Sequence, residues 1–306
     1  MPPPLIVVVG PTATGKSDLG LALAAALGGE VVNADAMALY RGLDIGTAKP
    51  SARQCAGIRH HLLDVLDITE AASVAAYQRA ARKVVEDLRA AGRTPVLVGG
   101  SGLYVQAVVD ELEFPGTDPA LRSALEAELA ELGSTALHTR LAAVDPAAAA
   151  VVLATNGRRI VRALEVVALT GRPFPAQLAT DGVPRYGAVL LGVDRPVAEL
   201  DERVARRVAR MFAGGLVAET RALAARGLRE GRTASRALGY QQVLTALDGP
   251  GDLMAAADQT VRATRRFVRR QRSWFRRDRR VHWLDGGPDL VEHAWTALRA
   301  RGVGPP

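Results

Sequence analysis

The residues of this chain with the clearest chemical use form a phosphate-binding loop near its start. Two glycines, a lysine and a serine stand in the spacing Gly10-x-x-x-x-Gly15-Lys16-Ser17, directly after the apolar run LIVVV. The glycines let backbone N–H groups curl around phosphate oxygens, the lysine adds a point charge, and the serine offers a hydroxyl to Mg²⁺. The residues of this predicted site are Gly10, Pro11, Thr12, Ala13, Thr14, Gly15, Lys16 and Ser17. The loop alone does not say whether the phosphates belong to ATP or to another ligand.

A carboxylate follows the second predicted strand. Residues 30–33 read as a short strand, and Asp35 comes just after it. Because residues past the carboxyl ends of parallel strands line the ligand crevice, Asp35 should lie close to the phosphate loop. Position alone leaves two roles open for it, the N-cap of a helix beginning at Ala36, or a base or Mg²⁺ partner.

A second glycine-rich turn follows another predicted strand. Residues 95–98 are apolar, and they run into Gly99-Gly100-Ser101-Gly102. Close approach of a ligand to the backbone and tight packing between elements explain such glycines about equally well. Both explanations stay open for this turn.

These candidate residues require strands and helices that alternate along the chain. Apolar residues on one face predict a helix over 73–91. From 118 onward the sequence becomes rich in Ala, Leu and Glu, and the next strand is predicted at 189–193. The pattern favours an α/β fold with a P-loop NTPase-like core, in which a mostly parallel sheet is flanked by helices. We expect residues 1–117 and 188–306 to form this core, and 118–187 to form a helical insertion domain.

The composition narrows the class of protein. A single cysteine, Cys55, excludes an internal disulfide and a cysteine-based zinc site. The chain has no run of 18 apolar residues and no charged-then-apolar leader, so we expect a cytoplasmic protein that does not enter a membrane. We also expect it to act as a monomer.

The charge is distributed unevenly along the chain. Residues 1–150 carry 12 basic and 17 acidic residues, a net charge of −5, whereas residues 151–306 carry 27 and 15, a net charge of +12. Ten arginines fall between Arg262 and Arg280 with one acidic residue, Asp278, among them. Because like charges repel, this arginine-rich segment favours a polyanionic partner such as nucleic acid. The alternative is a solvated basic surface in an arginine-rich protein.

A second group of arginines lies in the predicted insertion. The spacing of RRIVRALEV, residues 158–166, places Ile160 and Val161 inward and Arg158, Arg159 and Arg162 outward. We expect no acidic neighbour for these arginines, which leaves phosphate contact and a solvated face about equally open.

In combination, these segments resemble the tRNA dimethylallyltransferase family, also called tRNA isopentenyltransferases. They occur in the family's order over nearly the full length. The matching segments are GPTATGKS (10–17), NADAMALYRGLDIGTAKP (33–50), HHLLDV (60–65), GGSGLY (99–104), RRIVRALEV (158–166), ALGYQQ (237–242) and TRRFVRRQRSWFRRD (264–278).

The resemblance implies a reaction and a role for several residues. Family members transfer a dimethylallyl group from dimethylallyl diphosphate to N6 of an adenosine next to the anticodon of tRNA, with Mg²⁺, and release diphosphate. Lys16 and Ser17 would then hold diphosphate and Mg²⁺ in place of ATP. Asp35 would accept the N6 proton as a general base, and Arg221 would lie near the leaving diphosphate.

The resemblance also implies contacts to the anticodon stem-loop of tRNA. Ser101 stands where the family often has threonine, and Ala36 where it commonly has serine. The residues that match tRNA-contacting positions are Asp35, Ala36, Met37, Ala38, Ser101, Arg122, Arg158, Arg159, Ile160, Val161 and Arg162.

Three other functions fit part of the pattern. A P-loop kinase of a small molecule explains the phosphate loop and leaves the basic segment without a role. An isopentenyltransferase acting on free adenine nucleotides does not need so basic a second half. An ATP-dependent RNA-binding protein would need an Asp-Glu pair at a strand end, for which the sequence offers no convincing candidate.

Overall fold

The computed structural model describes residues 2–175, 182–249 and 251–304. The chain divides into two compact units, a larger one formed by Met1–Glu111 with Thr180–Pro306 and a smaller one formed by Leu112–Ala179. Both boundaries of the smaller unit lie earlier in the chain than the predicted 118 and 187.

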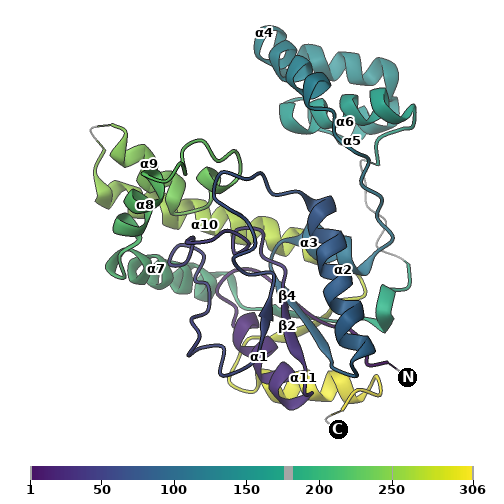
Figure 1. Ribbon diagram of the computed structural model, residues 1–306, viewed down its shortest axis with the longest axis vertical. Helices are drawn as coiled ribbons and strands as arrows, with labels where there is room; N and C mark the ends of the chain where they lie inside the picture. Colours follow the sequence, from purple (N-terminus) through teal and green to yellow (C-terminus); the bar gives the residue numbers. More distant parts are fainter. Residues whose placement is uncertain (1, 176–181, 250, 305–306) are drawn as a thin grey trace. The chain divides into compact units, whose positions relative to one another are not determined.

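A six-stranded parallel sheet lies at the centre of the larger unit (Figure 1). Its strands lie side by side in the order β3-β2-β4-β1-β5-β6. They are β1 (Ile6–Val9), β2 (Glu30–Asn33), β3 (His60–His61), β4 (Pro95–Gly99), β5 (Val189–Asp194) and β6 (His282–Asp285). The predicted α/β fold with a mostly parallel sheet is confirmed.

Helices cover both faces of this sheet (Figure 1). The alternation of strand side chains explains why: along β1, Val7 and Val9 enter one core cluster, and Ile6 and Val8 enter the other. The first face is covered by α2 (Val74–Ala90) and α3 (Gly102–Val109), the second by α1 (Lys16–Ala26) and α11 (Leu290–Arg299). The predicted helix over 73–91 is present, with the Ser73 hydroxyl accepting from the backbone N–H of Ala76 as its N-cap.

Four further helices of the larger unit extend its core. They are α7 (Val197–Ala213), α8 (Leu216–Ala224), α9 (Tyr240–Leu247) and α10 (Leu253–Phe275). Residues of α8 and α9 share a hydrophobic cluster with Tyr40 and Leu43, which lie in the loop after β2. Among the residues that the structure describes, no helix is long and apolar enough to cross a membrane.

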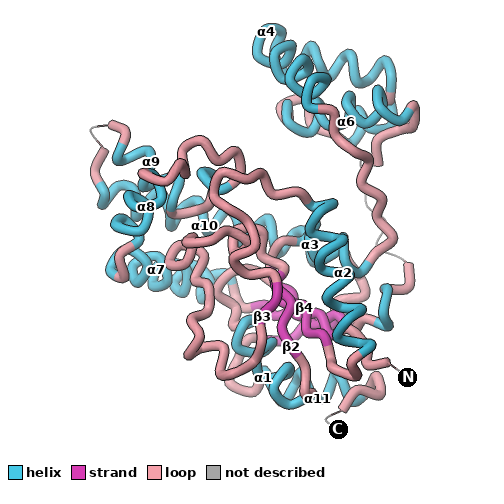
Figure 2. The backbone as a smooth tube through the Cα atoms, viewed as in Figure 1, coloured by secondary structure: helices cyan, strands magenta, loops and turns pink. Residues whose placement is uncertain are grey.

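The described part of the smaller unit consists of helices and loops (Figure 2). Asp118 caps α4 (Pro119–Val144), which contains a non-helical residue at Gly133. The remaining helices are α5 (Pro146–Val151) and α6 (Gly157–Thr170). Their apolar side chains form one separate core.

The smaller unit is organised by a buried carboxylate on α6, that of Glu165. This side chain is 0% exposed, and it accepts hydrogen bonds from the guanidinium groups of Arg122 and Arg162 and from the backbone N–H of Asp118. Although burial alone would raise the pKa of Glu165, the two arginines lower it. The expectation that Arg162 has no acidic neighbour was therefore wrong.

Two predicted tRNA contacts on α6 need a correction. Ile160 is 0% and Val161 is 2% exposed, and both pack in the core of the smaller unit. Their side chains support α6 from inside and are not available to a nucleic acid.

We expect the substitution Glu165→Gln to loosen the smaller unit. It removes the charge that two guanidinium groups share, so the free energy of local unfolding should fall by about 2 kcal/mol, less than for a fully buried pair because both arginines reach solvent. Hydrogen exchange of the backbone amides across 118–165 in the whole protein measures this change.

The matched control is Glu128→Gln on α4. Glu128 pairs with Arg140, which is half exposed. Loss of this ion pair should change the free energy of local unfolding, as measured by exchange, by no more than about 0.5 kcal/mol. Equal effects of both substitutions would contradict the organising role of Glu165.

Candidate active site

The phosphate loop joins β1, a central strand, to α1. Gly10 has a φ of 143°, and a Cβ there would lie 2.3 Å from the carbonyl oxygen of Val193 on β5, so the position accepts glycine alone. Gly15 precedes α1 and provides no side-chain cap. The first N–H groups of α1 are therefore free to bind an anion at the positive end of the helix dipole.

Side chains from distant parts of the chain hold this loop in place. Arg195 Nε donates to the carbonyl oxygen of Thr14 at 3.0 Å, and Arg203 Nε donates to that of Ala13 at 2.6 Å. From α10, Gln271 Oε1 accepts from the N–H of Thr12 at 2.9 Å. Sequence reasoning missed these three residues. The only local signal was the group of arginines on α7, which has no distinctive spacing and includes Arg203 alone of the three.

The ammonium of Lys16 is shielded from solvent and lies near a second cation. Its pKa is lowered to about 8, because burial disfavours the ammonium and Arg207 repels it, while Asp35 acts in the opposite direction. Burial likewise lowers the pKa of Arg207, against the attraction of Asp35. Lys16 Nζ donates to the carbonyl oxygen of Pro11 at 3.1 Å. Two cations beside one carboxylate leave a net positive charge where the loop opens.

Asp35 occupies the predicted place after β2, in a tight turn. Its Oδ1 accepts from the N–H of Met37 at 2.9 Å, and its own N–H donates to Asn33 Oδ1 at 3.0 Å. No helix begins at Ala36, so the N-cap role left open for Asp35 is excluded. The carboxylate closes a turn instead, at the carboxyl edge of the sheet that also carries the phosphate loop.

Ser101 connects the ends of β2 and β4. Its Oγ accepts from the N–H of Ala36 at 3.1 Å, while Ala38 is buried at 6% exposure. In the adjoining glycine turn, a Cβ at Gly102 would lie 2.2 Å from the ring of Trp274, and one at Gly99 would lie 2.2 Å from a backbone oxygen. Packing therefore accounts for these two glycines without a ligand.

The remaining predicted site residues lie elsewhere on the two units. Arg221 is exposed on α8, and no ion pair is found for it among the described residues. Arg158 is exposed on α6, and Arg159 lies over the ring of Phe174 at 5.4 Å. The functional assignments of these arginines stay predictions.

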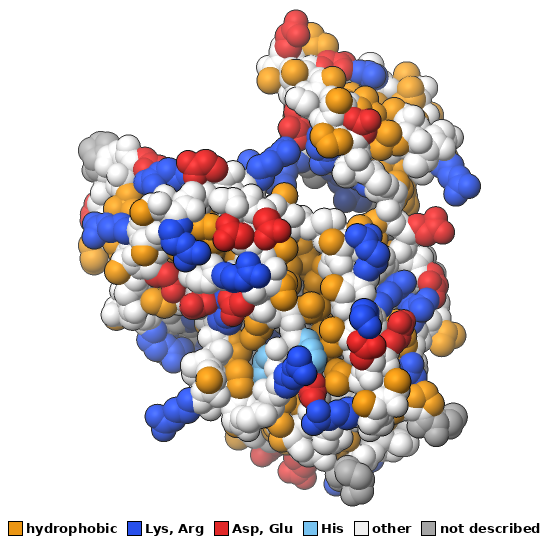
Figure 3. All heavy atoms as spheres, in the orientation of Figure 1, with side chains coloured by type: hydrophobic (Ala, Val, Ile, Leu, Met, Phe, Trp, Pro, Cys, Tyr) orange, Lys and Arg blue, Asp and Glu red, His pale blue; other side chains and the backbone are white. Residues whose placement is uncertain are grey.

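Much of the charge of the arginine-rich segment is balanced inside the larger unit. Asp194 on β5 accepts from Arg272 and Arg276 at 2.9 Å each, and the two arginines lower its pKa although burial alone would raise it. Asp201 pairs with Arg265 and Arg269, and Arg280 pairs with Asp110 and Asp278. The view that these arginines need an external anion was wrong for this subset. On the face drawn in Figure 3, acidic side chains lie among the basic ones.

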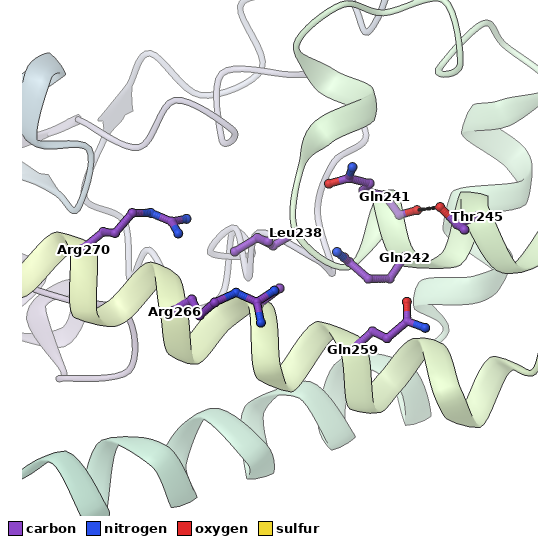
Figure 4. Close-up of a pocket in the computed structure, with 8 residues that line it drawn as sticks. Leu238, Gln241, Gln242, Thr245, Gln259, Arg266 and Arg270 are labelled. Atoms are coloured by element: carbon purple, nitrogen blue, oxygen red, sulfur yellow. Dashed lines mark hydrogen bonds between the residues drawn. The ribbon is translucent and has the colours of Figure 1, made fainter. Parts of the chain in front are cut away.

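Two arginines of the segment instead line a polar pocket between α9 and α10. Arg266 and Arg270 extend from α10 beside Gln241 and Gln242 of α9, around a cavity of about 380 Å³ (Figure 4). Guanidinium and amide groups match the acceptors of phosphates and of unpaired base edges.

Comparisons with known proteins agree with this geometry. The family model described as IPP transferase matches residues 38–278. The tRNA dimethylallyltransferase of Salinispora arenicola (strain CNS-205) is 64% identical over 297 residues, which cover 97% of this chain and 86% of the relative. That of Nocardia farcinica (strain IFM 10152) is 63% identical over 294 residues, covering 96% of this chain and 94% of the relative.

Solved structures show the same fold. The full-length tRNA isopentenylpyrophosphate transferase from Bacillus halodurans aligns with a TM-score of 0.71 and 37% identity, covering 98% of each chain. A eukaryotic dimethylallyltransferase acting on tRNA aligns with a TM-score of 0.78 at 23% identity, covering 97% of this chain and 77% of that one. With a family model that spans most of its length and relatives more than 60% identical across nearly all of it, this chain belongs to the IPP transferase family.

Proposed function

We propose that this protein transfers a dimethylallyl group from dimethylallyl diphosphate to N6 of the adenosine 3′-adjacent to the anticodon in tRNA, and releases diphosphate. The observation that carries the proposal is that the carboxylate of Asp35 follows β2 at the edge of the sheet that also carries the phosphate loop, where it attracts the cations Lys16 and Arg207. It puts a base next to an anion site, which is what this transfer requires. Relatives more than 60% identical carry the name tRNA dimethylallyltransferase.

Asp35 acts as the general base. The lone pair of an adenine amino group is delocalised into the ring, so the nitrogen attacks well only as it loses a proton. The N6–C1 bond forms while the C1–O bond to diphosphate breaks, the proton passes to the carboxylate, and the electron pair leaves with the diphosphate oxygen. A positioned base typically contributes a factor of about 10² to 10⁴.

Positive groups stabilise the leaving diphosphate. The first N–H groups of α1, the ammonium of Lys16 and the guanidinium of Arg207 stabilise the negative charge that grows on the leaving diphosphate. Arg195 and Arg203 keep the loop in the conformation that directs those N–H groups. We assign Arg221 to the same diphosphate on the strength of the family resemblance.

A magnesium ion fits the residues that are present. The Ser17 hydroxyl is exposed on the first turn of α1 and makes no hydrogen bond within the described residues, and these contain no cluster of three ligating side chains. Mg²⁺ commonly takes few protein ligands and completes its shell with substrate phosphates and water. Ser17 would hold it, and the ion would supply further positive charge to the diphosphate.

The anticodon stem-loop of tRNA binds to both units. In the smaller unit, Arg158 and Arg159 offer positive charge, and Arg122 and Arg162 together exceed the single charge of Glu165. In the larger unit, Asp35, Ala36, Met37, Ser101 and the pocket of Arg266 and Arg270 face the RNA. The side chain of Ala38 is buried, so the predicted contact of Ala38 with tRNA needs the same correction as those of Ile160 and Val161. A stacked base cannot reach Asp35, so the adenosine flips out of its loop. The reaction takes place in the cytoplasm, with the protein as a monomer.

The reaction itself is tested with unmodified tRNA carrying adenosine 3′ to the anticodon. Incubation with dimethylallyl diphosphate and Mg²⁺, followed by mass analysis of the nucleosides, should show one dimethylallyl group on that adenosine. Parallel samples contain AMP or ATP instead of tRNA. Prenylation of AMP, or consumption of ATP without RNA, together with unmodified tRNA would support the rival functions and refute this one.

The base assignment is tested with Asp35→Asn. Asparagine keeps the oxygen that accepts from Met37 but cannot take the proton, so the single-turnover transfer rate should fall by a factor of about 10² to 10⁴. The affinity for tRNA, measured by filter binding, should stay within a factor of two. The control, Asp18→Asn, changes an exposed carboxylate on α1 and should leave both quantities unaltered. Transfer at the normal rate by Asp35→Asn would remove Asp35 from this role.

The charge on Lys16 makes diphosphate binding depend on pH. A bound anion favours the protonated ammonium, so the affinity is present below the Lys16 pKa of about 8 and is lost as the pH rises through it. Calorimetric titration with inorganic diphosphate should show an affinity about tenfold lower at pH 9 than at pH 7.

Diphosphate itself also titrates in this range, so the comparison uses Lys16→Arg. A guanidinium stays charged over this pH range. The affinity of Lys16→Arg for diphosphate should therefore change with pH only because diphosphate itself titrates. Parallel profiles for the two proteins would show that the ammonium of Lys16 does not titrate near pH 8.

A further inference from the structure

A buried tyrosine and a carboxylate form a hydrogen-bonded pair between α8 and α9. Tyr240 is 0% exposed, and its hydroxyl donates to Oε1 of Glu219. Burial and the neighbouring carboxylate both raise the pKa of Tyr240, so the hydroxyl keeps its proton and remains a donor.

This pair binds the backbone of the loop that follows β2. The N–H of Ile45 donates to both carboxylate oxygens of Glu219 at 3.1 Å, and the N–H of Gly46 donates to the hydroxyl of Tyr240 at 3.0 Å. The tyrosine ring packs directly on that backbone, because a Cβ at Gly46 would lie 2.3 Å from it. Successive N–H groups are thus fixed by one carboxylate and one hydroxyl.

The same loop is fixed again a few residues later. Lys49, whose side chain is 5% exposed, donates to the carbonyl oxygen of Tyr40 at 2.8 Å and pairs with Asp44 and Asp64. The hydroxyl of Thr47 donates to the carbonyl oxygen of Leu43 at 2.6 Å. The segment 44–49 is therefore held at both ends, with Thr47 between them.

Thr47 connects this segment to the active site. Its carbonyl oxygen accepts from Nη2 of Arg207 at 3.0 Å. Arg207 is the cation that interacts with both Lys16 and Asp35. The orientation of the Arg207 guanidinium consequently depends on the position of the Thr47 carbonyl oxygen.

From these contacts we propose that Glu219 and Tyr240 are positioning residues for the transfer reaction. They hold the 44–47 backbone so that the Thr47 carbonyl aims Arg207 at the diphosphate. This inference rests on the proposed function for the role of Arg207. Neither residue of the pair touches a reacting atom.

A double-substitution cycle tests the proposal on the whole protein. Tyr240→Phe removes the hydroxyl and leaves the ring on Gly46, so kcat should fall about tenfold, since a misdirected guanidinium mainly weakens transition-state stabilisation. The KM for dimethylallyl diphosphate should stay within about twofold. In the background Arg207→Met, which keeps the stem and removes the guanidinium, Tyr240→Phe should change kcat by less than about twofold.

The chain contains a matched control in Tyr40. This tyrosine is also 0% exposed, shares the hydrophobic cluster of Tyr240, and uses its hydroxyl to contact the backbone of Glu70 and Ala72. Tyr40→Phe should lower the melting temperature about as much as Tyr240→Phe while leaving kcat normal. If Tyr240→Phe does not fold, Glu219→Gln enters the same cycle.

The possible outcomes separate this inference from the proposed function. A tenfold loss that disappears in the Arg207→Met background supports it. The same loss in both backgrounds, or a normal kcat in folded Tyr240→Phe, overturns it while tRNA prenylation by the unsubstituted protein stands. If the unsubstituted protein does not prenylate tRNA, the proposed function fails first, and the role of the pair falls with it.

Discussion

The site at the carboxyl end of β1 contains more cationic than anionic side chains. The rest of the site depends on this excess of positive charge. Lys16 and Arg207 repel each other, and within the described part of the chain Asp35 is the carboxylate that attracts both. Burying such a cluster costs free energy unless an anion completes it. Lys16 is also the first residue of α1, whose uncapped N–H groups lie at the positive end of the helix dipole. The fold therefore maintains a site whose charge is balanced when a phosphate group binds.

That arrangement requires a rigid support, which comes from hydrogen bonds to backbone carbonyls. Arg195 and Arg203 bind carbonyl oxygens of the phosphate loop, and Arg207 binds that of Thr47. A bond to a neutral carbonyl leaves the guanidinium charge in place, as for Arg207, whereas Arg195 also pairs with Glu199, which offsets its charge. At the end of α10, Arg272 and the C-cap residue Arg276 share the single carboxylate of Asp194, which offsets one of their two charges. Arginines of the larger unit thus fix the geometry of the phosphate loop and, where carboxylates do not offset them, also supply positive potential.

The sequence predicted those parts of the site that are formed by residues close together along the chain. Apolar runs predicted β1, β2, β4 and β5, glycine spacing predicted the phosphate loop, and the position after β2 predicted Asp35, whereas β3, formed by His60 and His61, was not predicted. It could not identify Arg203, which meets the loop from 190 residues away, or Gln271, which does so from 259. Periodicity tells which face of a helix is polar and does not tell what that face meets. The same limit hid Glu165, whose buried carboxylate binds Arg122 across 43 residues.

The number of hydrogen bonds that a carboxylate accepts distinguishes structural carboxylates from a possible general base in this protein. Glu165 accepts from two guanidinium groups and a backbone N–H, and Asp194 accepts from two guanidinium groups and the N–H of Arg195. Their lone pairs are occupied, and a lowered pKa makes both poor proton acceptors. Within the described residues, the carboxylate of Asp35 accepts a single hydrogen bond, from Met37. Its second oxygen retains free lone pairs beside the anion site. Of these three carboxylates, Asp35 alone can take a proton from a nucleophile without first breaking an ion pair.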